Sequence, residues 1–191
     1  TYHYKGEVVN TPSFELELHE ELPLDVTDSE EEISIKSGEL TLVITKKNWS
    51  MTYYRNGEMI TRSAGRDLAL MRTDFKGFAY NDTDAEETYM RQMLSLSVGE
   101  LVYGTGERFT PFVKNGQSID IWNADGGTST EQSYKNIPFF ITNKGYGVLV
   151  NHPEKVSIEV ATEMVTRTEF SVPGGYLDYF LINGPTMKEV L

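Results

Sequence analysis

The most informative part of this chain is the stretch from Tyr103 to Phe140, which reads YGTGERFTPFVKNGQSIDIWNADGGTSTEQSYKNIPFF. It mixes glycines, prolines, carboxylates and aromatic rings in segments that are too irregular for one long helix or strand. Loops that place polar groups beside aromatic faces have this composition. The stretch therefore predicts functional loops between short strands.

On both sides of this stretch, hydrophobic residues alternate with polar ones at a period of two, as in half-buried strands. The pair Asn56-Gly57 lies between the alternating runs Trp49–Tyr54 and Met59–Arg62, which predicts a hairpin with a type I′ turn. The span Gly65–Glu87 is less regular and is predicted to be mainly loop. Further strands are predicted over Met90–Val98, Leu101–Tyr103, Ser118–Trp122, Phe139–Thr142, Gly147–Asn151, Val156–Ala161, Met164–Val172 and Tyr176–Ile182.

Many short strands separated by turn signals, with almost no helical periodicity, predict an all-β fold, an antiparallel β-sandwich. At 191 residues, of which 39% are hydrophobic and 12% aromatic, the chain is long enough to bury a core of its own. We therefore expect a single large domain over residues 1–184.

The C-terminus carries a helix signal. Thr186 and Glu189 have the spacing of a capping box, in which each side chain bonds the backbone amide of the other residue. A helix is therefore expected to begin at Met187. Since one turn of helix is not self-supporting, we expect residues 185–191 to lead into a further element.

Composition excludes several classes of function. The net charge is -12, and this sign disfavours nucleic acids and anionic membranes as partners. No apolar run approaches the length of a membrane helix, and Thr1–Asn10 has no signal-peptide pattern. The chain has no cysteine, which excludes disulfides and fits a cytoplasmic location.

Carboxylates are the first candidates for catalysis. Glycoside hydrolysis uses two carboxyl groups, roughly 5–5.5 Å apart in retaining and 6.5–9.5 Å apart in inverting enzymes. Glu107, Asp120, Asp125 and Glu131 lie near the glycine-rich loops, but their spacing selects no pair. Turn capping or solvation is the more frequent role of such residues, so no catalytic residue is predicted within this chain.

The histidines offer no metal site. They are scattered, and none has metal-ligand spacing. His152, which precedes Pro153 at the end of a predicted strand, is expected to serve a turn. No dinucleotide or phosphate-binding fingerprint is complete. We therefore predict neither a metal nor a cofactor.

The segment Trp122–Gly127, reading WNADGG, has two interpretations. Trp122 offers a flat apolar face for a sugar ring, and the side chains of Asn123 and Asp125 can hydrogen-bond ring hydroxyls. The glycines at its end permit close approach of the backbone. Alternatively, the segment is an Asx-turn beside a core tryptophan. The residues alone leave both interpretations open.

Several motifs, in order, resemble glycoside hydrolase family 31, especially its α-xylosidase-like branch. They cover roughly Met90–Leu191 and are Tyr103–Phe109 (YGTGERF), Trp122–Asp125 (WNAD), Tyr134–Phe140 (YKNIPFF), Gly145–Asn151 (GYGVLVN) and Gly184–Thr186 (GPT). The resemblance implies a galactose-mutarotase-like β-sandwich that precedes a (β/α)8 catalytic barrel. In that family the barrel supplies the nucleophile and the acid/base of a retaining mechanism, so both would lie beyond Leu191.

The resemblance also implies roles and partners. Asp125 would contact substrate, with Trp122 and Asn123 shaping its loop. The substrate would be an α-linked xyloside or glucoside oligosaccharide, the first partner the chain's own barrel, and the complete enzyme a homo-oligomer. The chain by itself would be catalytically silent. The principal alternative is a free-standing carbohydrate-binding module, which would bind an isolated sugar measurably.

Overall fold

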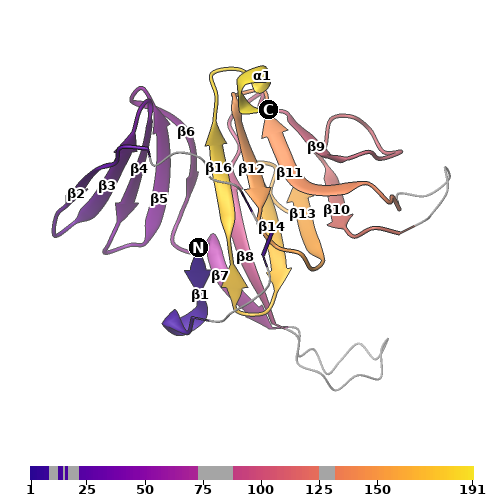
Figure 1. Ribbon diagram of the computed structural model, residues 1–191, viewed down its shortest axis with the longest axis horizontal. Coiled ribbons are helices and arrows are strands. Elements are labelled where there is room, and N and C mark those ends of the chain that lie inside the picture. Colours follow the sequence, from indigo (N-terminus) through magenta and orange to yellow (C-terminus); the bar gives the residue numbers. More distant parts are fainter. Residues whose placement is uncertain (9–12, 15, 17–21, 73–87, 125–131) are drawn as a thin grey trace.

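The computed structural model describes residues 1–8, 13–14, 16, 22–72, 88–124 and 132–191. Within these residues the fold is built almost entirely of antiparallel strands, as predicted (Figure 1). Its helical segments are the 3-10 turn η1 (Tyr4–Gly6) and the single-turn helix α1 (Met187–Val190). Among the described residues, no helix is long and apolar enough to cross a lipid bilayer.

Two sheets face one another and form the sandwich. The five-stranded sheet has the order β10 (Gln117–Ile121), β13 (Val156–Val160), β14 (Arg167–Pro173), β8 (Thr88–Ser95) and β7 (Leu68–Arg72). The four-stranded sheet has the order β16 (Tyr179–Asn183), β12 (Tyr146–Val150), β11 (Asn136–Thr142) and β9 (Val102–Gly106). A small pair joins β1 (Tyr2–His3) to β15 (Tyr176–Leu177).

The core lies between these two sheets. Strand β13 has the burial pattern of a strand with one face in the core, because Val156, Ile158 and Val160 are fully buried and alternate with partly exposed residues. Phe140 on β11 packs against Phe170 on β14 with ring centroids 6.4 Å apart. Burying each such side chain stabilises the fold by roughly 1.5–3 kcal/mol.

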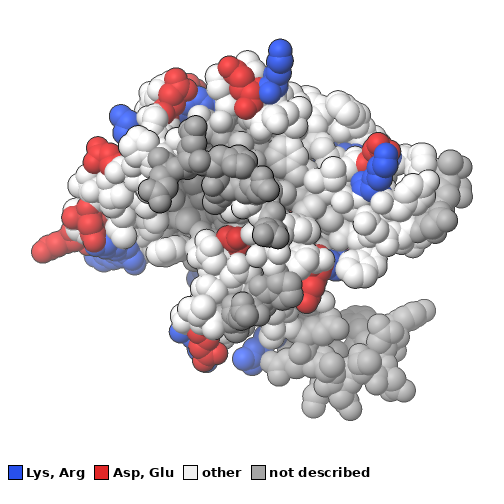
Figure 2. Space-filling view, in the orientation of Figure 1, with Lys and Arg blue, Asp and Glu red and all other residues white. Residues whose placement is uncertain are grey.

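A third sheet, here called the outer sheet, lies beside the sandwich (Figure 1). Its order is β2 (Asp25–Asp28), β3 (Glu32–Ser37), β4 (Leu40–Thr45), β5 (Ser50–Arg55) and β6 (Glu58–Ser63). The predicted hairpin is confirmed between β5 and β6, where Asn56 and Gly57 have φ angles of 49° and 83°. Acidic and basic side chains are interspersed over this sheet and along the top of the same face (Figure 2).

Strand β5 fixes the outer sheet to the sandwich. Its side chains Met51 and Tyr53 are part of the common core. The hydroxyl of Tyr53 lies 3.1 Å from that of Tyr179 on β16. Arg55 donates from Nε to Asn183 Oδ1 at 2.7 Å, and its guanidinium also donates to the carbonyls of Lys144 and Gly145. The outer sheet and the sandwich therefore share both apolar and polar contacts.

The helix predicted at the C-terminus is present. Thr186 Oγ1 accepts from the Glu189 amide at 3.4 Å, and Glu189 Oε2 accepts from the Thr186 amide at 3.0 Å, which completes the capping box. Val190 is buried on the sandwich beside Gly147, where a Cβ would lie 2.8 Å from its Cγ1. The helix thus packs closely because this position on β12 is glycine.

Several strands differ in detail from the prediction, and the predicted strand Tyr176–Ile182 is divided into β15 and β16. Strand β7 (Leu68–Arg72) lies within Gly65–Glu87, which was expected to be mainly loop and in which no strand was predicted, and it pairs in register with β8. Residues 73–87 of that span are outside the described residues. Strand β2 was not predicted, since all four of its residues are exposed and two of them are aspartates. Strand β14 begins at Arg167 rather than Met164, because the preceding residues form a turn.

Candidate functional site

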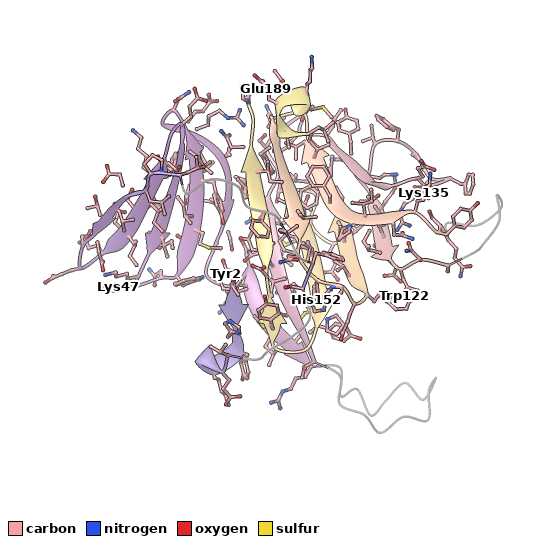
Figure 3. The ribbon with its side chains drawn as sticks, in the orientation of Figure 1. Tyr2, Lys47, Trp122, Lys135, His152 and Glu189 are labelled. Carbon is pink, nitrogen blue, oxygen red and sulfur yellow. The ribbon has the colours of Figure 1, made fainter. Side chains whose placement is uncertain are left out.

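Trp122 and Asn123 directly follow strand β10. Ile121, the last residue of that strand, is buried in the core, whereas the side chain of Trp122 is 58% exposed. Trp122 therefore does not belong to the core, which argues against the core-tryptophan interpretation of this segment. It lies at the lower end of the sandwich, near β10 (Figure 3). Asp125 and residues 126–131 are outside the described residues, so the role of Asp125 stays a prediction.

Asn123 holds the start of this loop against the start of β11. Its Oδ1 accepts from the backbone amide of Asn136 at 3.0 Å and from Asn136 Nδ2 at 3.1 Å. The backbone of Asn123 forms a parallel bridge with Ser133, and the Ala124 amide donates to the Ser133 carbonyl at 2.9 Å. The Asn123 side-chain oxygen is thus occupied in fixing the loop.

Asn136 is the centre of this hydrogen-bond network, and it was not among the site residues predicted from the sequence. Its Nδ2 donates to the carbonyls of Trp122 at 2.8 Å and Ser133 at 2.6 Å. Its Oδ1 accepts from the Arg108 guanidinium, which also donates to the Asp120 carbonyl at 2.6 Å. One amide group therefore ties the Trp122 backbone to two neighbouring segments.

The glycines of the YGTGERF motif allow β9 and β11 to approach closely. Gly106 has a φ of 90°, and a Cβ at this position would lie only 1.9 Å from the carbonyl oxygen of Lys135. The next amide, that of Glu107, donates to this same carbonyl at 3.0 Å. Only glycine fits here, so the motif has a structural reason that is independent of any ligand.

The candidate carboxylates that the structure describes are engaged by lysines. Glu107 pairs with Lys135 at 2.9 Å, and Asp120 pairs with Lys155 at 2.6 Å; all four side chains are exposed. Asp125 and Glu131 lie outside the described residues. Among the residues that are described, no three His, Asp or Glu side chains converge as metal ligands.

A groove of about 300 Å³ opens beside Trp122. Its lining combines aromatic and proline rings with a few polar groups and includes Phe14, Trp122, Asn123, Pro138, His152 and Glu154. The backbone of Phe14 is fixed by donation from its amide to Asn151 Oδ1 at 2.9 Å. The groove therefore joins the predicted loop residues to side chains that are distant in sequence.

His152 is the residue of this groove whose role sequence reasoning did not identify. It was expected to serve a turn, and its backbone amide does donate to the Val150 carbonyl at 3.0 Å. Its side chain also lines the groove and is only 4% exposed. Its Nε2 lies 3.8 Å from Glu154 Oε2. Burial lowers the pKa of His152 below its ordinary value, and the neighbouring Glu154 opposes this only in part. Burial thus favours the neutral form of the imidazole.

The fold and the groove together define an all-β domain with polar loops beside an aromatic-lined groove. The chain matches the family described as the glycosyl hydrolase 31 N-terminal galactose mutarotase-like domain over residues 1–159, and it belongs to this family. The predicted fold and family resemblance are thereby confirmed.

Two curated relatives are α-xylosidases. The chain is 42% identical over 182 residues to α-xylosidase XylQ of Lactiplantibacillus pentosus, covering 94% of this chain and 22% of the relative. It is 61% identical over 103 residues to an α-xylosidase of Emericella nidulans, covering 54% of this chain and 13% of the relative. The chain thus spans less than a quarter of either relative.

Solved structures support the fold. A Flavobacterium johnsoniae GH31 dextranase complexed with glucose superposes with a TM-score of 0.78 at 20% identity, covering 97% of this chain and 22% of that chain. A GH31 α-xylosidase from a soil metagenome complexed with xylose gives 0.72 at 16% identity, covering 96% and 28%. At these identities the likeness shows the fold alone.

Proposed function

We propose that this chain is the accessory N-terminal domain of a retaining α-glycosidase that acts on α-linked xylosides, and that its Trp122–Asp125 loop contacts the substrate. The nucleophile and acid/base belong, in this proposal, to a (β/α)8 barrel that follows Leu191. The curated α-xylosidases named above support the choice of xylosides. The chain alone is expected to be inactive.

The observation that carries the proposal is the exposure of Trp122 above an anchored backbone. Asn136 fixes the Trp122 carbonyl and the Asn123 side chain, while the indole ring itself stays 58% exposed. A rigid backbone that presents an aromatic face and amide groups is suited to a neutral sugar, because little ordering is needed on binding. Asp125, two residues after Asn123, is proposed to accept from a substrate hydroxyl.

The test is the substitution Asp125→Ala in the complete polypeptide that carries this chain. Loss of one hydrogen bond to a hydroxyl should lower kcat/KM for an aryl α-xyloside by about 5- to 150-fold, which corresponds to about 1–3 kcal/mol. Trapping with a fluorinated xylosyl substrate should still give the covalent intermediate. Asp28→Ala, which removes an exposed carboxylate from the outer sheet, is the matched control. Normal kinetics for Asp125→Ala would contradict the assigned role.

The position of the catalytic barrel is tested separately, by reading the coding sequence downstream of Leu191. The proposal requires an open frame of alternating strands and helices with aspartates at strand ends. A stop codon within a few residues would overturn the accessory role. The chain would then be treated as a carbohydrate-binding module.

A further inference from the structure

We propose that the groove beside Trp122 binds one ring of a neutral sugar, and that His152 supplies the hydrogen bonds at its inner wall. This inference rests on the proposed function and extends it from the Trp122–Asp125 loop to a second set of contacts. It assigns a binding role to His152 and Phe14, which the family motifs do not include.

The His152 imidazole is buried without hydrogen-bond partners among the described residues. His152 is 4% exposed, and neither Nδ1 nor Nε2 has a hydrogen-bond partner within the part of the chain that the structure describes. A buried polar group without a partner costs roughly 1–3 kcal/mol of stability. The presence of such a side chain in the wall of a groove is explained if a ligand supplies the missing hydrogen-bond partner.

The residues that line the groove have the chemistry of a neutral-sugar site. A neutral imidazole has one donor and one acceptor nitrogen, which matches a hydroxyl group that both donates and accepts. Glu154, whose Oε2 lies 3.8 Å from His152 Nε2, adds an acceptor at the rim. Trp122 and Phe14 add aromatic surface for the apolar face of a ring. The Glu154 carboxylate and the net charge of -12 disfavour an anionic ligand.

The groove also has the size and the position of a site for a single sugar ring. A volume of about 300 Å³ lies at the lower limit of small-molecule sites, which suits one sugar ring rather than an extended chain. His152 and Trp122 lie at the same lower end of the sandwich (Figure 3). Separate hydrogen bonds hold the two segments in place. Asn136 Nδ2 donates to the Trp122 carbonyl, and Asn151, next to His152, donates from Nδ2 to Asp178 Oδ2 at 2.8 Å. The backbone around the groove is thus held in place, and a sugar hydroxyl reaches the buried imidazole nitrogens after a local movement of side chains.

The experiment uses the fluorescence of Trp122 in the 191-residue chain. The substitution Trp49→Phe leaves Trp122 as the sole tryptophan. Cooperative thermal unfolding first verifies that each variant is folded. Titration with xylose or glucose is expected to give a saturable change in Trp122 emission, whereas the acyclic polyol sorbitol should give none.

Two substitutions at His152 then separate binding from stability. His152→Phe should weaken sugar binding by about 5- to 150-fold, since two hydrogen bonds are lost. It should leave the melting temperature unchanged or raise it, because an unpaired polar group is replaced by an apolar ring. His152→Gln, which retains a donor and an acceptor, should recover part of the affinity.

His3→Phe is the matched control. His3 Nδ1 also has no hydrogen-bond partner among the described residues, but the ring packs on Tyr176 with ring centroids 5.0 Å apart. His3 is not part of the described lining of the groove. This substitution should leave the titration unchanged. The inference is overturned if neither sugar gives a saturable signal, if sorbitol gives the same signal, or if His152→Phe binds as the parent does. Reduced kcat/KM for Asp125→Ala with no role for His152 would leave the proposed function intact.

Discussion

Replacing the partly buried glutamate Glu169 by glutamine should change how the stability of this domain depends on pH. Glu169 lies on β14, where its side chain is 14% exposed. It pairs in register with Glu159 on β13, so two carboxylates lie directly opposite one another. Arg91 on β8 approaches it to 3.9 Å. Burial raises the pKa of Glu169 to about 7, Arg91 opposes this, and Glu159 and Glu163 add to it.

The direction in which stability changes with pH follows from which state binds the Glu169 proton more tightly. The folded state holds the Glu169 proton more tightly than the unfolded state, so the free energy of unfolding must fall as pH rises. The loss occurs between the ordinary pKa of 4.5 and about 7. At 1.36 kcal/mol for each unit, the full shift corresponds to about 3 kcal/mol, which is an upper value for this one group. Glu169→Gln has no proton to lose at this position, so its free energy of unfolding should not show this decrease.

Urea unfolding followed by far-UV circular dichroism measures this difference. At about pH 4.5, Glu169→Gln and the parent should have similar free energies of unfolding. At about pH 8 the variant should be more stable by up to about 3 kcal/mol. Glu39→Gln, in the exposed turn between β3 and β4, should follow the parent at both pH values. Equal pH dependence of Glu169→Gln and the parent would refute the reasoning.

Two further substitutions test the network around the candidate site by urea unfolding. Asn136→Ala removes the donor to the Trp122 and Ser133 carbonyls and the acceptor for Arg108, so it should cost about 2–4 kcal/mol; a loss below about 0.5 kcal/mol would contradict its central role. Gly106→Ala places a Cβ against the Lys135 carbonyl and should cost more than about 3 kcal/mol, whereas Gly116→Ala, with open space and a φ of 84°, should cost only about 1–2 kcal/mol. Similar losses for the two glycine variants would refute the argument from close approach.

Features that depend on neighbouring residues were predictable from the sequence. The turn at Asn56-Gly57 is decided by residues that tolerate positive φ, and the helix start at Thr186 by the reach of two short side chains. Both are confirmed, because no distant partner can easily replace these local bonds. The alternating strands of the core follow from the same kind of local pattern, with burial on every second residue.

Features that depend on distant partners were not predictable. Strand β7 is a short apolar run among charged residues, and only its register with β8 makes it a strand. Only part of the candidate site was predicted, because Trp122 and Asn123 stand out in the sequence. Asn136 and His152 contribute through contacts with residues 13 or more positions away. Nothing adjacent to His152 indicates that its ring lines a groove, since that depends on Phe14 and on the packing of two sheets.

The attachment of the outer sheet has a consequence for recombination between relatives. Tyr53 and Arg55 make contacts with β16 and with the turn before β12, and Met51 lies in the common core. A crossover placed between the outer sheet and the sandwich would separate these partners and leave a buried tyrosine and a guanidinium without acceptors. Chimeras that exchange the sugar-facing loop should therefore keep residues 22–72 and the sandwich strands from one parent, and exchange only residues 122–135, between β10 and β11.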